Sequence, residues 1–360
     1  MKKLKAGVIG VGNCFAGLIQ GIEYYKKNKD EKLGLMHERI GSYGVEDVDF
    51  VCAFDIGENK VGSPLSKAIY AEPNKVRWME KVSGCDDVTV KESPILDGVG
   101  IYVENMIKPI KQTKSIKQLE KEAIEEVESS GAKVLINYLP VGSQKATEFW
   151  ANVALKTNSG FVNCMPVFIA SSQSWAKKFQ KKKIPVVGDD IKGVLGATIT
   201  HRTLAKLCID RGAVIDKTYQ INVGGNTDFC NMLERSRLES KKTSKTEAVQ
   251  SLIPNRLPSD NIYIGPSDFI PFLGNTKLAF IRIEGRMFAD IPFNMELRLD
   301  VDDKANSGGI VIDAIRCCQL AIDRGIGGPL IGPSAWLMKH PPTQYSDEEA
   351  KRLVEEFIKG

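Results

Sequence analysis

The chain has 360 residues, of which 42% are hydrophobic and 26% are charged, and its 49 basic and 45 acidic residues leave a net charge of +4. This composition is typical of a globular protein with room for two domains and a sizeable core, and it argues against a disordered or fibrous chain. No long block of one charge sign is present, so the sequence predicts neither nucleic acid nor a membrane as a partner.

Cysteine usage and hydropathy predict the compartment. No apolar run approaches the roughly 20 residues that a spanning helix needs, and the chain runs from Met1 straight into a short apolar strand. The eight cysteines form no CxxC pair, and several lie in apolar runs, as Cys52 does. Buried thiols in a reducing compartment are the best interpretation of this pattern. We therefore expect a soluble, cytoplasmic protein.

The first predicted strand runs into a glycine turn and then a helix. Gly10 allows a tight turn, Gly12 lets the backbone approach a pyrophosphate, and the helix that begins near Asn13 and Cys14 offers unpaired N–H groups. Phe15 occupies the position of the third glycine, so the motif is half of a Rossmann fingerprint. A dinucleotide site is the functional interpretation, and a glycine turn without a ligand is the alternative.

The second predicted strand, residues 49–55, ends in a carboxylate at Asp55. A carboxylate at that place accepts hydrogen bonds from the adenosine ribose and repels the 2′-phosphate of NADP. The sequence therefore favours NAD as cofactor. The polar residues 28–44 lengthen the usual spacing and are expected to lie at the surface.

The next segments alternate between helix and strand. Helices are predicted over 115–130 and 144–156, and apolar strands over 134–140, 160–166 and 185–190. This alternation predicts a parallel, doubly wound sheet whose ligands lie at the carboxyl ends of the strands. The residues at those ends are candidates to bind the cofactor, with ordinary turn chemistry as the alternative: Asn137, Pro140, Gly142, Ser143, Asn163, Pro166 and Asp189.

The pattern changes after residue 200. A helix over 200–211 is followed by a strand over 217–223, a helical region to about residue 252, and alternating strands over 278–284 and 294–300. Strands clustered in this way predict a largely antiparallel sheet in an α+β domain.

A last long helix is predicted over 310–324, with its cap within 306–309. We therefore expect three parts: an NAD-binding Rossmann domain over 1–199, a substrate and oligomerisation domain over 200–305, and a helical segment over 306–360 that returns to the first domain.

Four separated segments each deliver a lysine: GDDIK (188–192), SKKTSK (240–245), SDFIPFLGNTK (267–277) and SAWLMKHPP (334–342). Lysines neutralise phosphates, stabilise oxyanions and act as bases when burial or a neighbouring cation lowers their pKa. Lys241 and Lys245 are four residues apart, so on a helix they share a face and repel each other. A solvated helix face is the alternative for that pair.

The chain resembles the bacterial and archaeal type of myo-inositol-1-phosphate synthase. The resemblance covers most of the chain in order and is carried by these motifs: GVGNC (10–14), NYLPVGS (137–143), FVNCMP (161–166), GDDIKGVLGATITHRTL (188–204), NVGGNTDF (222–229), SKKTSK (240–245), SDFIPFLGNTK (267–277), NSGGIVIDAIR (306–316) and LMKHPP (337–342).

The resemblance implies an isomerase that uses NAD without consuming it. Glucose 6-phosphate is oxidised at carbon five, the carbon-six protons become acidic, the enolate closes the ring on carbon one, and the ring ketone is reduced to give 1L-myo-inositol 1-phosphate. This is the first step of inositol and inositol-phospholipid biosynthesis. The resemblance also implies a homotetramer formed through the second domain.

The resemblance further implies the catalytic residues Lys241, Lys245, Lys277 and Lys339, with Asp190 as their acidic partner. We expect Lys245 and Lys277 to bind the phosphate and Lys241 and Lys339 to act on the reacting oxygens, with Lys241 as a base. Residues 193–198 replace the polar Ser-Gly-Gln-Thr of the eukaryotic members, so backbone N–H groups are expected to help hold the phosphate.

Three points stay open in the sequence. Family members differ in whether a divalent or monovalent cation assists, and Asp190 and Asp303 are the candidate ligands. An NAD-dependent dehydrogenase of a phosphorylated polyol or semialdehyde is the second functional candidate, and it would accumulate NADH. A catalytically inactive NAD-binding sensor is the third, and it would bind ligands without turnover.

Overall fold

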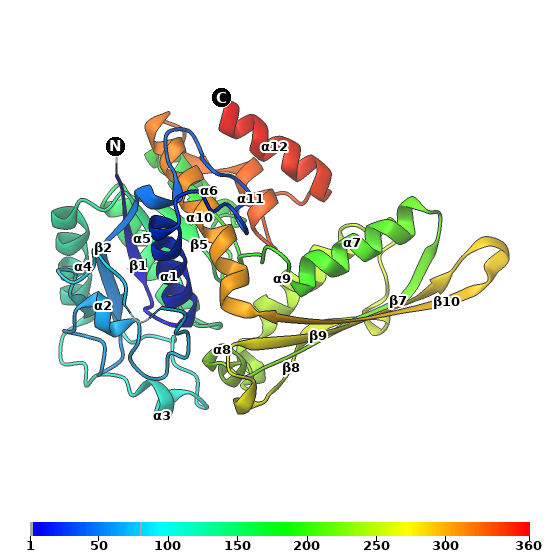
Figure 1. Cartoon of the computed structure of the whole chain (residues 1–360), viewed down its shortest axis with the longest axis horizontal. Helices are drawn as coiled ribbons and strands as arrows, with labels where there is room; N and C mark the ends of the chain where they lie inside the picture. The colour runs from blue at the N-terminus through cyan, green and yellow to red at the C-terminus, as the bar shows by residue number, and fades with distance from the viewer. Residues whose placement is uncertain (1–2, 80) are drawn as a thin grey trace.

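The computed structural model describes residues 3–79 and 81–360, which form two sheets that lie side by side along the length of the molecule (Figure 1). One sheet has seven strands in the order β11-β6-β5-β4-β1-β2-β3, and the other has four in the order β10-β9-β7-β8. Within the described residues, no helix is both long and apolar enough to cross a membrane.

Every strand pairing in the seven-stranded sheet is parallel. Its strands are β1 (Leu4–Ile9), β2 (Val48–Asp55), β3 (Val90–Glu92), β4 (Val134–Asn137), β5 (Gly160–Asn163), β6 (Pro185–Val187) and β11 (Gly328–Pro329). The strand order reverses beside β1, and in a doubly wound sheet ligands bind in the crevice at such a point. The predicted parallel, doubly wound sheet is confirmed. Several strands end three residues earlier than predicted.

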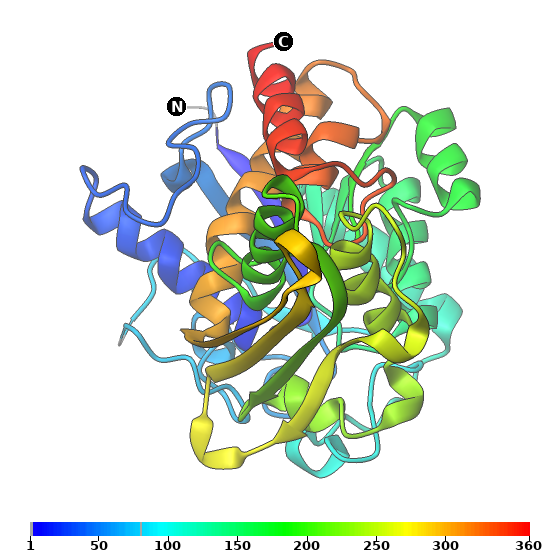
Figure 2. The same cartoon turned by 90° about the vertical axis from the view of Figure 1, so that its right-hand side faces the viewer.

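Helices cover both faces of this sheet (Figures 1 and 2). They are α1 (Asn13–Lys27) and α10 (Asp303–Asp323) on one face, which pack on each other, and α4 (Ile116–Ser130), α5 (Gln144–Lys156) and α6 (Gln173–Lys182) on the other. The short helix α2 (Leu65–Ala68) lies between β2 and β3, and the short helix α3 (Glu104–Ile107) lies between β3 and α4. Two hydrophobic cores result, one on each face.

The four-stranded sheet is mixed. It contains β7 (Val214–Gly224), β8 (Ile262–Phe269), β9 (Thr276–Arg286) and β10 (Pro292–Asp302). β9 pairs antiparallel with β7 and β10, as predicted, whereas β8 pairs parallel with β7. Strand β8 was not predicted, because Gly265 and Pro266 weaken a strand signal. Helices α7 (Ala197–Asp210) and α9 (Glu239–Gln250) pack on one face of this sheet.

Helix α10 joins the two sheets. It begins at Asp303, immediately after β10, and the Asp302 carboxylate caps it by accepting hydrogen bonds from the backbone N–H groups of Lys304 and Ala305. The prediction of a cap within 306–309 was wrong, because Gly308 and Gly309 lie inside the helix. A side chain at Gly309 would come within 2.7 Å of the Gly34 carbonyl oxygen, so glycine here permits close packing.

The remaining elements complete the chain. They are α8 (Thr227–Asn231), α11 (Ile331–Leu337), α12 (Asp347–Lys359) and the 3₁₀ turns Val45–Asp47, Arg235–Arg237, Ser259–Asn261, Pro271–Leu273 and Phe288–Asp290. All eight cysteines are free, and all except the half-buried Cys14 are buried, as predicted.

Candidate active site

A pocket lies between the carboxyl ends of the parallel strands and the near end of the four-stranded sheet. Its lining comes from both sheets and from α10. One side, the glycine-turn half, contains Gly10, Gly12, Asn13, Cys14 and Asp55. The other side, the lysine half, contains Asp190, Asp228, Lys241, Lys245, Lys277, Asp303, Lys304 and Lys339.

The glycine turn has the geometry of an anion site. Gly10 has φ +92°, and a Cβ there would lie 2.8 Å from the Tyr138 carbonyl oxygen. No heavy atom lies within 4 Å of the position that a Cβ on Gly12 would take, so the pocket reaches the backbone there. Helix α1 follows directly and has no side-chain cap. The N–H groups of its first turn are therefore available to a phosphate.

Asp55 is held at the end of β2 with its carboxylate in the pocket. Its Oδ2 accepts a hydrogen bond of 2.7 Å from the N–H of Val11, and its Oδ1 accepts bonds of 2.8 Å from the N–H groups of Ile56 and Gly57. These bonds tie the carboxylate to the glycine turn. Its orientation is thus fixed, and it retains lone pairs for the hydroxyl groups of a ligand.

Of the other predicted cofactor residues, Pro140 and Pro166 line the pocket, whereas five do not: Asn137, Gly142, Ser143, Asn163 and Asp189. The buried amide of Asn137 donates to the Asn163 side chain at 2.9 Å, and Asn163 donates to Asp189 at 2.7 Å. Burial raises the pKa of Asp189 to about 6, although Asn163 and the N–H groups of residues 169–171 bind its carboxylate. This hydrogen-bond network links the carboxyl ends of β4 and β5 to Asp189, and none of its three side chains lines the pocket.

The four predicted lysines meet in the lysine half. Lys241 and Lys245 come from α9, Lys277 from the start of β9 and Lys339 from the segment after α11, and all four line the pocket. The predicted helix does place Lys241 and Lys245 on one buried face. Chain segments up to about 150 residues apart thus converge, as the 149-residue separation between Asp190 and Lys339 shows.

Three carboxylates pair with three of these lysines. Lys241 Nζ lies 2.9 Å from Asp228 Oδ2, Lys339 Nζ lies 2.9 Å from Asp190 Oδ1, and Lys277 Nζ lies 3.2 Å from Asp303 Oδ1. The Ser244 hydroxyl donates to the second oxygen of Asp190 at 2.7 Å. The Nζ of Lys192, two residues after Asp190, lies 3.7 Å from Asp347 Oδ1.

The lysines keep all three carboxylates ionised. Burial by itself would raise the pKa of each aspartate, but the neighbouring ammonium groups outweigh burial. Lys339 and Lys241 lower the pKa of Asp190, Lys241 and Lys304 lower that of Asp228, and Lys277 and Lys304 lower that of Asp303 far below its usual value.

The lysines themselves differ in pKa. Burial favours the neutral form of Lys241, but Asp228 and Asp190 outweigh burial and raise its pKa. Burial and then the cations Lys241, Lys277 and Lys339 lower the pKa of Lys245 well below its usual value. Burial also lowers the pKa of Lys339, although Asp190 opposes it. These directions favour Lys339 over Lys241 as a neutral amine.

Lys245 is the member of the cluster without a partner. In the part of the chain that the structure describes, its ammonium forms no hydrogen bond or ion pair. It is 4% exposed and lines the pocket. A buried amine without such a partner is suited to bind an anion from outside, because the anion supplies the counter-charge that the ammonium form needs.

The N-terminus of α7 adds further hydrogen-bond donors for an anion. Gly193, Gly196, Ala197 and Thr198 line the pocket, and α7 begins at Ala197 after Gly196 without a side-chain cap. The role expected of residues 193–198 in holding a phosphate through backbone N–H groups stays a prediction.

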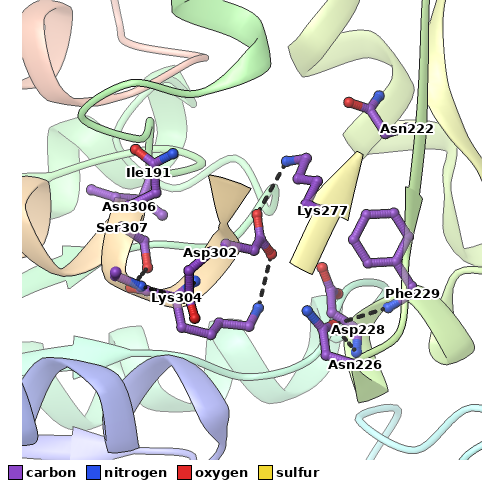
Figure 3. Close-up of polar contacts among 12 residues, drawn as sticks. Ile191, Asn222, Asn226, Asp228, Phe229, Lys277, Asp302, Lys304, Asn306 and Ser307 are labelled. Carbon is purple, nitrogen blue, oxygen red and sulfur yellow. Dashed lines mark hydrogen bonds and ion pairs between the residues drawn. The ribbon is translucent and has the colours of Figure 1, made fainter. Parts of the chain in front are cut away.

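Two site residues escaped the sequence analysis. Asp228 lies in the NVGGNTDF motif, where the Asn226 side chain accepts a hydrogen bond of 3.0 Å from its N–H and thereby caps α8 (Figure 3). Lys304 follows Asp303, and its ammonium lies 3.1 Å from Asp303 Oδ2. Figure 3 shows Lys277 and Lys304 reaching the same carboxylate. The only sequence signals were the motif around Asp228 and a lysine beside an aspartate.

The arrangement does not offer an open set of oxygen ligands for a divalent cation. The oxygens of Asp190 and Asp303 are engaged by Lys339, Ser244, Lys277 and Lys304. Among the described residues, no group of three or more His, Cys, Asp or Glu side chains has the geometry to hold a metal ion. Calcium and magnesium sites need several free oxygen donors.

Comparison with known proteins identifies the family. The family model of myo-inositol-1-phosphate synthase matches residues 196–304. A Mycolicibacterium smegmatis protein named inositol-3-phosphate synthase is 48% identical over 370 residues, which cover 99% of this chain and 98% of that protein. A Corynebacterium glutamicum protein of the same name is 45% identical over 367 residues, with coverage of 99% and 98%.

A crystal structure of a myo-inositol-1-phosphate synthase-related protein from Thermotoga maritima has the same fold, with a TM-score of 0.84 over 99% of this chain and 98% of that one at 21% identity. The matches to the two synthases each cover 99% of this chain. The chain therefore belongs to the myo-inositol-1-phosphate synthase family.

Proposed function

We propose that this protein converts glucose 6-phosphate into 1L-myo-inositol 1-phosphate, with NAD as a recycled cofactor. One observation carries the proposal: a glycine turn suited to a dinucleotide shares its pocket with a lysine cluster in which Lys245 forms no ion pair with any residue that the structure describes. A phosphorylated sugar supplies a counter-charge. The 48% identity to a protein named inositol-3-phosphate synthase supports the same choice.

The glycine-turn half fits NAD. The N–H groups at the start of α1 and the open backbone at Gly12 would hold the pyrophosphate, and Asp55 would accept hydrogen bonds from the adenosine ribose. When bound, NAD supplies the acceptor and later the donor of one hydride, so the conversion has no net redox change. The charge of Asp55 disfavours the 2′-phosphate of NADP.

The lysine half would hold the substrate phosphate at one end. Lys245 and Lys277 supply ammonium groups, and the N-terminus of α7 supplies backbone N–H groups. The phosphate would raise the pKa of Lys245 and keep that lysine charged, because an adjacent anion favours the ammonium form. Phosphate binding then fixes the position of the reacting carbons.

Lys241 and Lys339 would act on the reacting oxygens. The pair with Asp228 keeps Lys241 protonated, so it is suited to stabilise the oxyanions that develop during enolisation and ring closure. Lys339 has a lowered pKa and lies on Asp190, so it is suited to take and return a proton at a substrate hydroxyl. This differs from the sequence-based expectation that Lys241 is the base.

The test is incubation with glucose 6-phosphate and a small amount of NAD, followed by phosphorus NMR of the product and absorbance of NADH. We expect many molecules of inositol phosphate for each NAD and no accumulation of NADH. Stoichiometric NADH with an oxidised sugar phosphate would instead show a dehydrogenase. The Lys241→Met variant, incubated in parallel, controls for contaminating enzymes.

We further propose a homotetramer assembled through the second domain. Side chains along the whole of β10 are exposed or half-buried, and the adjoining hairpin tip carries Phe288 at 93% exposure between the exposed Met287 and Ile291. Apolar surface of this kind is typical of an interface. Light scattering coupled to size exclusion tests the proposal, and a monomer-sized species would contradict it.

A further inference from the structure

Lys304 occupies a place in the pocket that the proposed reaction leaves without a role. It is the second residue of α10, is 3% exposed and lines the pocket between the glycine turn and Lys277. Its Cβ lies 3.3 Å from the position that a Cβ on Gly17 of α1 would take, so glycine at position 17 leaves room for it. The stem of Lys304 is thus packed at the junction of α1 and α10.

The charge of Lys304 is tied to Asp303. Its Nζ lies 3.1 Å from Asp303 Oδ2, and Lys277 Nζ lies 3.2 Å from Oδ1 of the same residue. One half-buried carboxylate therefore has an ammonium group on each oxygen. This is the place where a metal ion would sit if Asp303 were a ligand, because a cation must approach the same lone pairs.

A divalent cation is also disfavoured by the surrounding charge. Asp190, the other candidate ligand, has Lys339 on one oxygen and Ser244 on the other. The ammonium groups of Lys241, Lys277 and Lys304 lie in the same pocket and would repel a further cation. A bound metal would have to displace at least one of these ion pairs.

We propose that Lys304 is a built-in cation of this site: its ammonium on Asp303 supplies the positive charge that a metal ion would otherwise bring there, so the enzyme works without a divalent cation. The proposal rests on the proposed function for its kinetic readout. Lys304 is a positioning residue, which keeps Asp303, and through it Lys277, in place. Removing the ammonium should leave Asp303 open to an external cation.

The first experiment uses the wild-type protein. After dialysis against EDTA, turnover of glucose 6-phosphate is measured with and without added Mg²⁺, Mn²⁺ or Zn²⁺. We expect equal rates in all samples. A loss of activity in EDTA that one of these cations restores would overturn the proposal. This experiment needs no variant and decides the matter even if a substitution at position 304 prevents folding.

The second experiment uses Lys304→Ala, with Lys177→Ala as a control on the exposed face of α6. Loss of one charge-assisted contact predicts a fall in kcat/KM of about tenfold to a hundredfold. Methylammonium should restore part of it, whereas choline at the same ionic strength should not, because choline has no N–H donors. A fall without any rescue, in a protein that still melts cooperatively, would contradict the proposal.

The third readout is independent of activity. Mn²⁺ binding is followed by electron paramagnetic resonance in wild type, Lys304→Ala and Lys304→Ala with Asp303→Asn. We expect Mn²⁺ to bind to the Lys304→Ala variant and not to the other two proteins. If Mn²⁺ bound to wild type and the Asp303→Asn substitution abolished that binding, the proposal would be overturned. If wild type made no inositol phosphate under any condition, the proposed function would fail, while this titration would still decide the role of Lys304.

Discussion

The two halves of the pocket bind charge in different ways. The glycine-turn half uses backbone N–H groups at the start of α1 and one carboxylate, Asp55, that three backbone N–H groups hold. The lysine half uses long, flexible side chains from several segments, and it orders them by pairing Lys241, Lys277 and Lys339 with buried or half-buried carboxylates. Backbone dipoles are fixed by the fold, whereas side-chain cations need counter-charges to be buried.

The comparison also shows where protonation matters. No side chain in the glycine turn itself has to change charge to hold a phosphate. In the lysine half the pKa of Lys241 is raised while the pKa values of Lys245 and Lys339 are lowered, although all three lysines lie in one pocket. Burial lowers the pKa of all three lysines, and only at Lys241 do the adjacent carboxylates outweigh it, whereas neighbouring cations add to the effect of burial at Lys245 and Lys339. Substitutions in the two halves of the pocket should therefore impair different properties of the protein.

The largest effect is expected at Lys241. Lys241→Met should reduce turnover by about a hundredfold or more, because it removes an ammonium from the developing oxyanion, and it should leave NAD affinity unchanged. Lys242→Met, which alters the exposed neighbour on α9, is the matched control. Steady-state kinetics and NAD titration calorimetry measure both. Near-normal turnover in Lys241→Met would remove Lys241 from the site.

Replacing each lysine by arginine separates the two roles, because a guanidinium stays protonated. Lys241→Arg should retain more activity than Lys241→Met if Lys241 acts as an ammonium group, whereas Lys339→Arg should be as inactive as Lys339→Met if Lys339 acts as a base. The opposite ranking would return the base role to Lys241.

Lys245 should couple phosphate binding to proton uptake. Its pKa is held well below the usual value by burial and by Lys241, and an anion beside it raises the pKa again. Calorimetry of inorganic phosphate binding at pH 8 in two buffers of different ionisation enthalpy should show proton uptake by wild type and none by Lys245→Met. The variant should also bind phosphate about tenfold more weakly. Binding without proton uptake in wild type would show that Lys245 is already charged.

Substitution of Asp55 tests the glycine-turn half alone. Asp55→Ala should weaken NAD binding by roughly tenfold and reduce the preference for NAD over NADP, because it removes the acceptor for the ribose hydroxyls. Phosphate binding in the lysine half should not change. Asp55→Asn keeps the size of the side chain and separates loss of charge from collapse of the loop. Equal affinity of wild type and variant for both dinucleotides would show that Asp55 does not contact the cofactor.

The smallest effect concerns stability and pH. Burial, followed by repulsion from Arg202, lowers the pKa of Lys192 from 10.5 to about 7. Between those two values the unfolded chain binds more protons than the folded chain, so this group makes the folded state more stable as pH rises from 7 toward 10. Urea unfolding at pH 7 and pH 9 should show a larger gain for wild type than for Lys192→Met. An equal gain would mean that Lys192 stays charged in the folded state.

Much of the fold and part of the site followed from sequence. The parallel sheet was predicted from apolar strands between amphipathic helices, and helix 144–156 was predicted with the bounds that α5 has. Gly10, Gly12 and Asp55 were found because a tight turn and a strand end leave local signals. The shared face of Lys241 and Lys245 followed from the helical repeat. The family resemblance brought in Lys277 and Lys339, which have no local signal of their own.

The tertiary structure alone decided how the charges are paired. No pattern in the sequence places Asp228 on Lys241, or Lys304 and Lys277 on the two oxygens of Asp303, or turns Asn163 and Asp189 away from the pocket into a buried network. Periodicity and turn motifs report the local backbone, because they arise from contacts between near neighbours in the chain. The charge state of a buried lysine depends instead on which carboxylate lies within about 4 Å of it, and that distance is set by the packing of segments far apart in sequence.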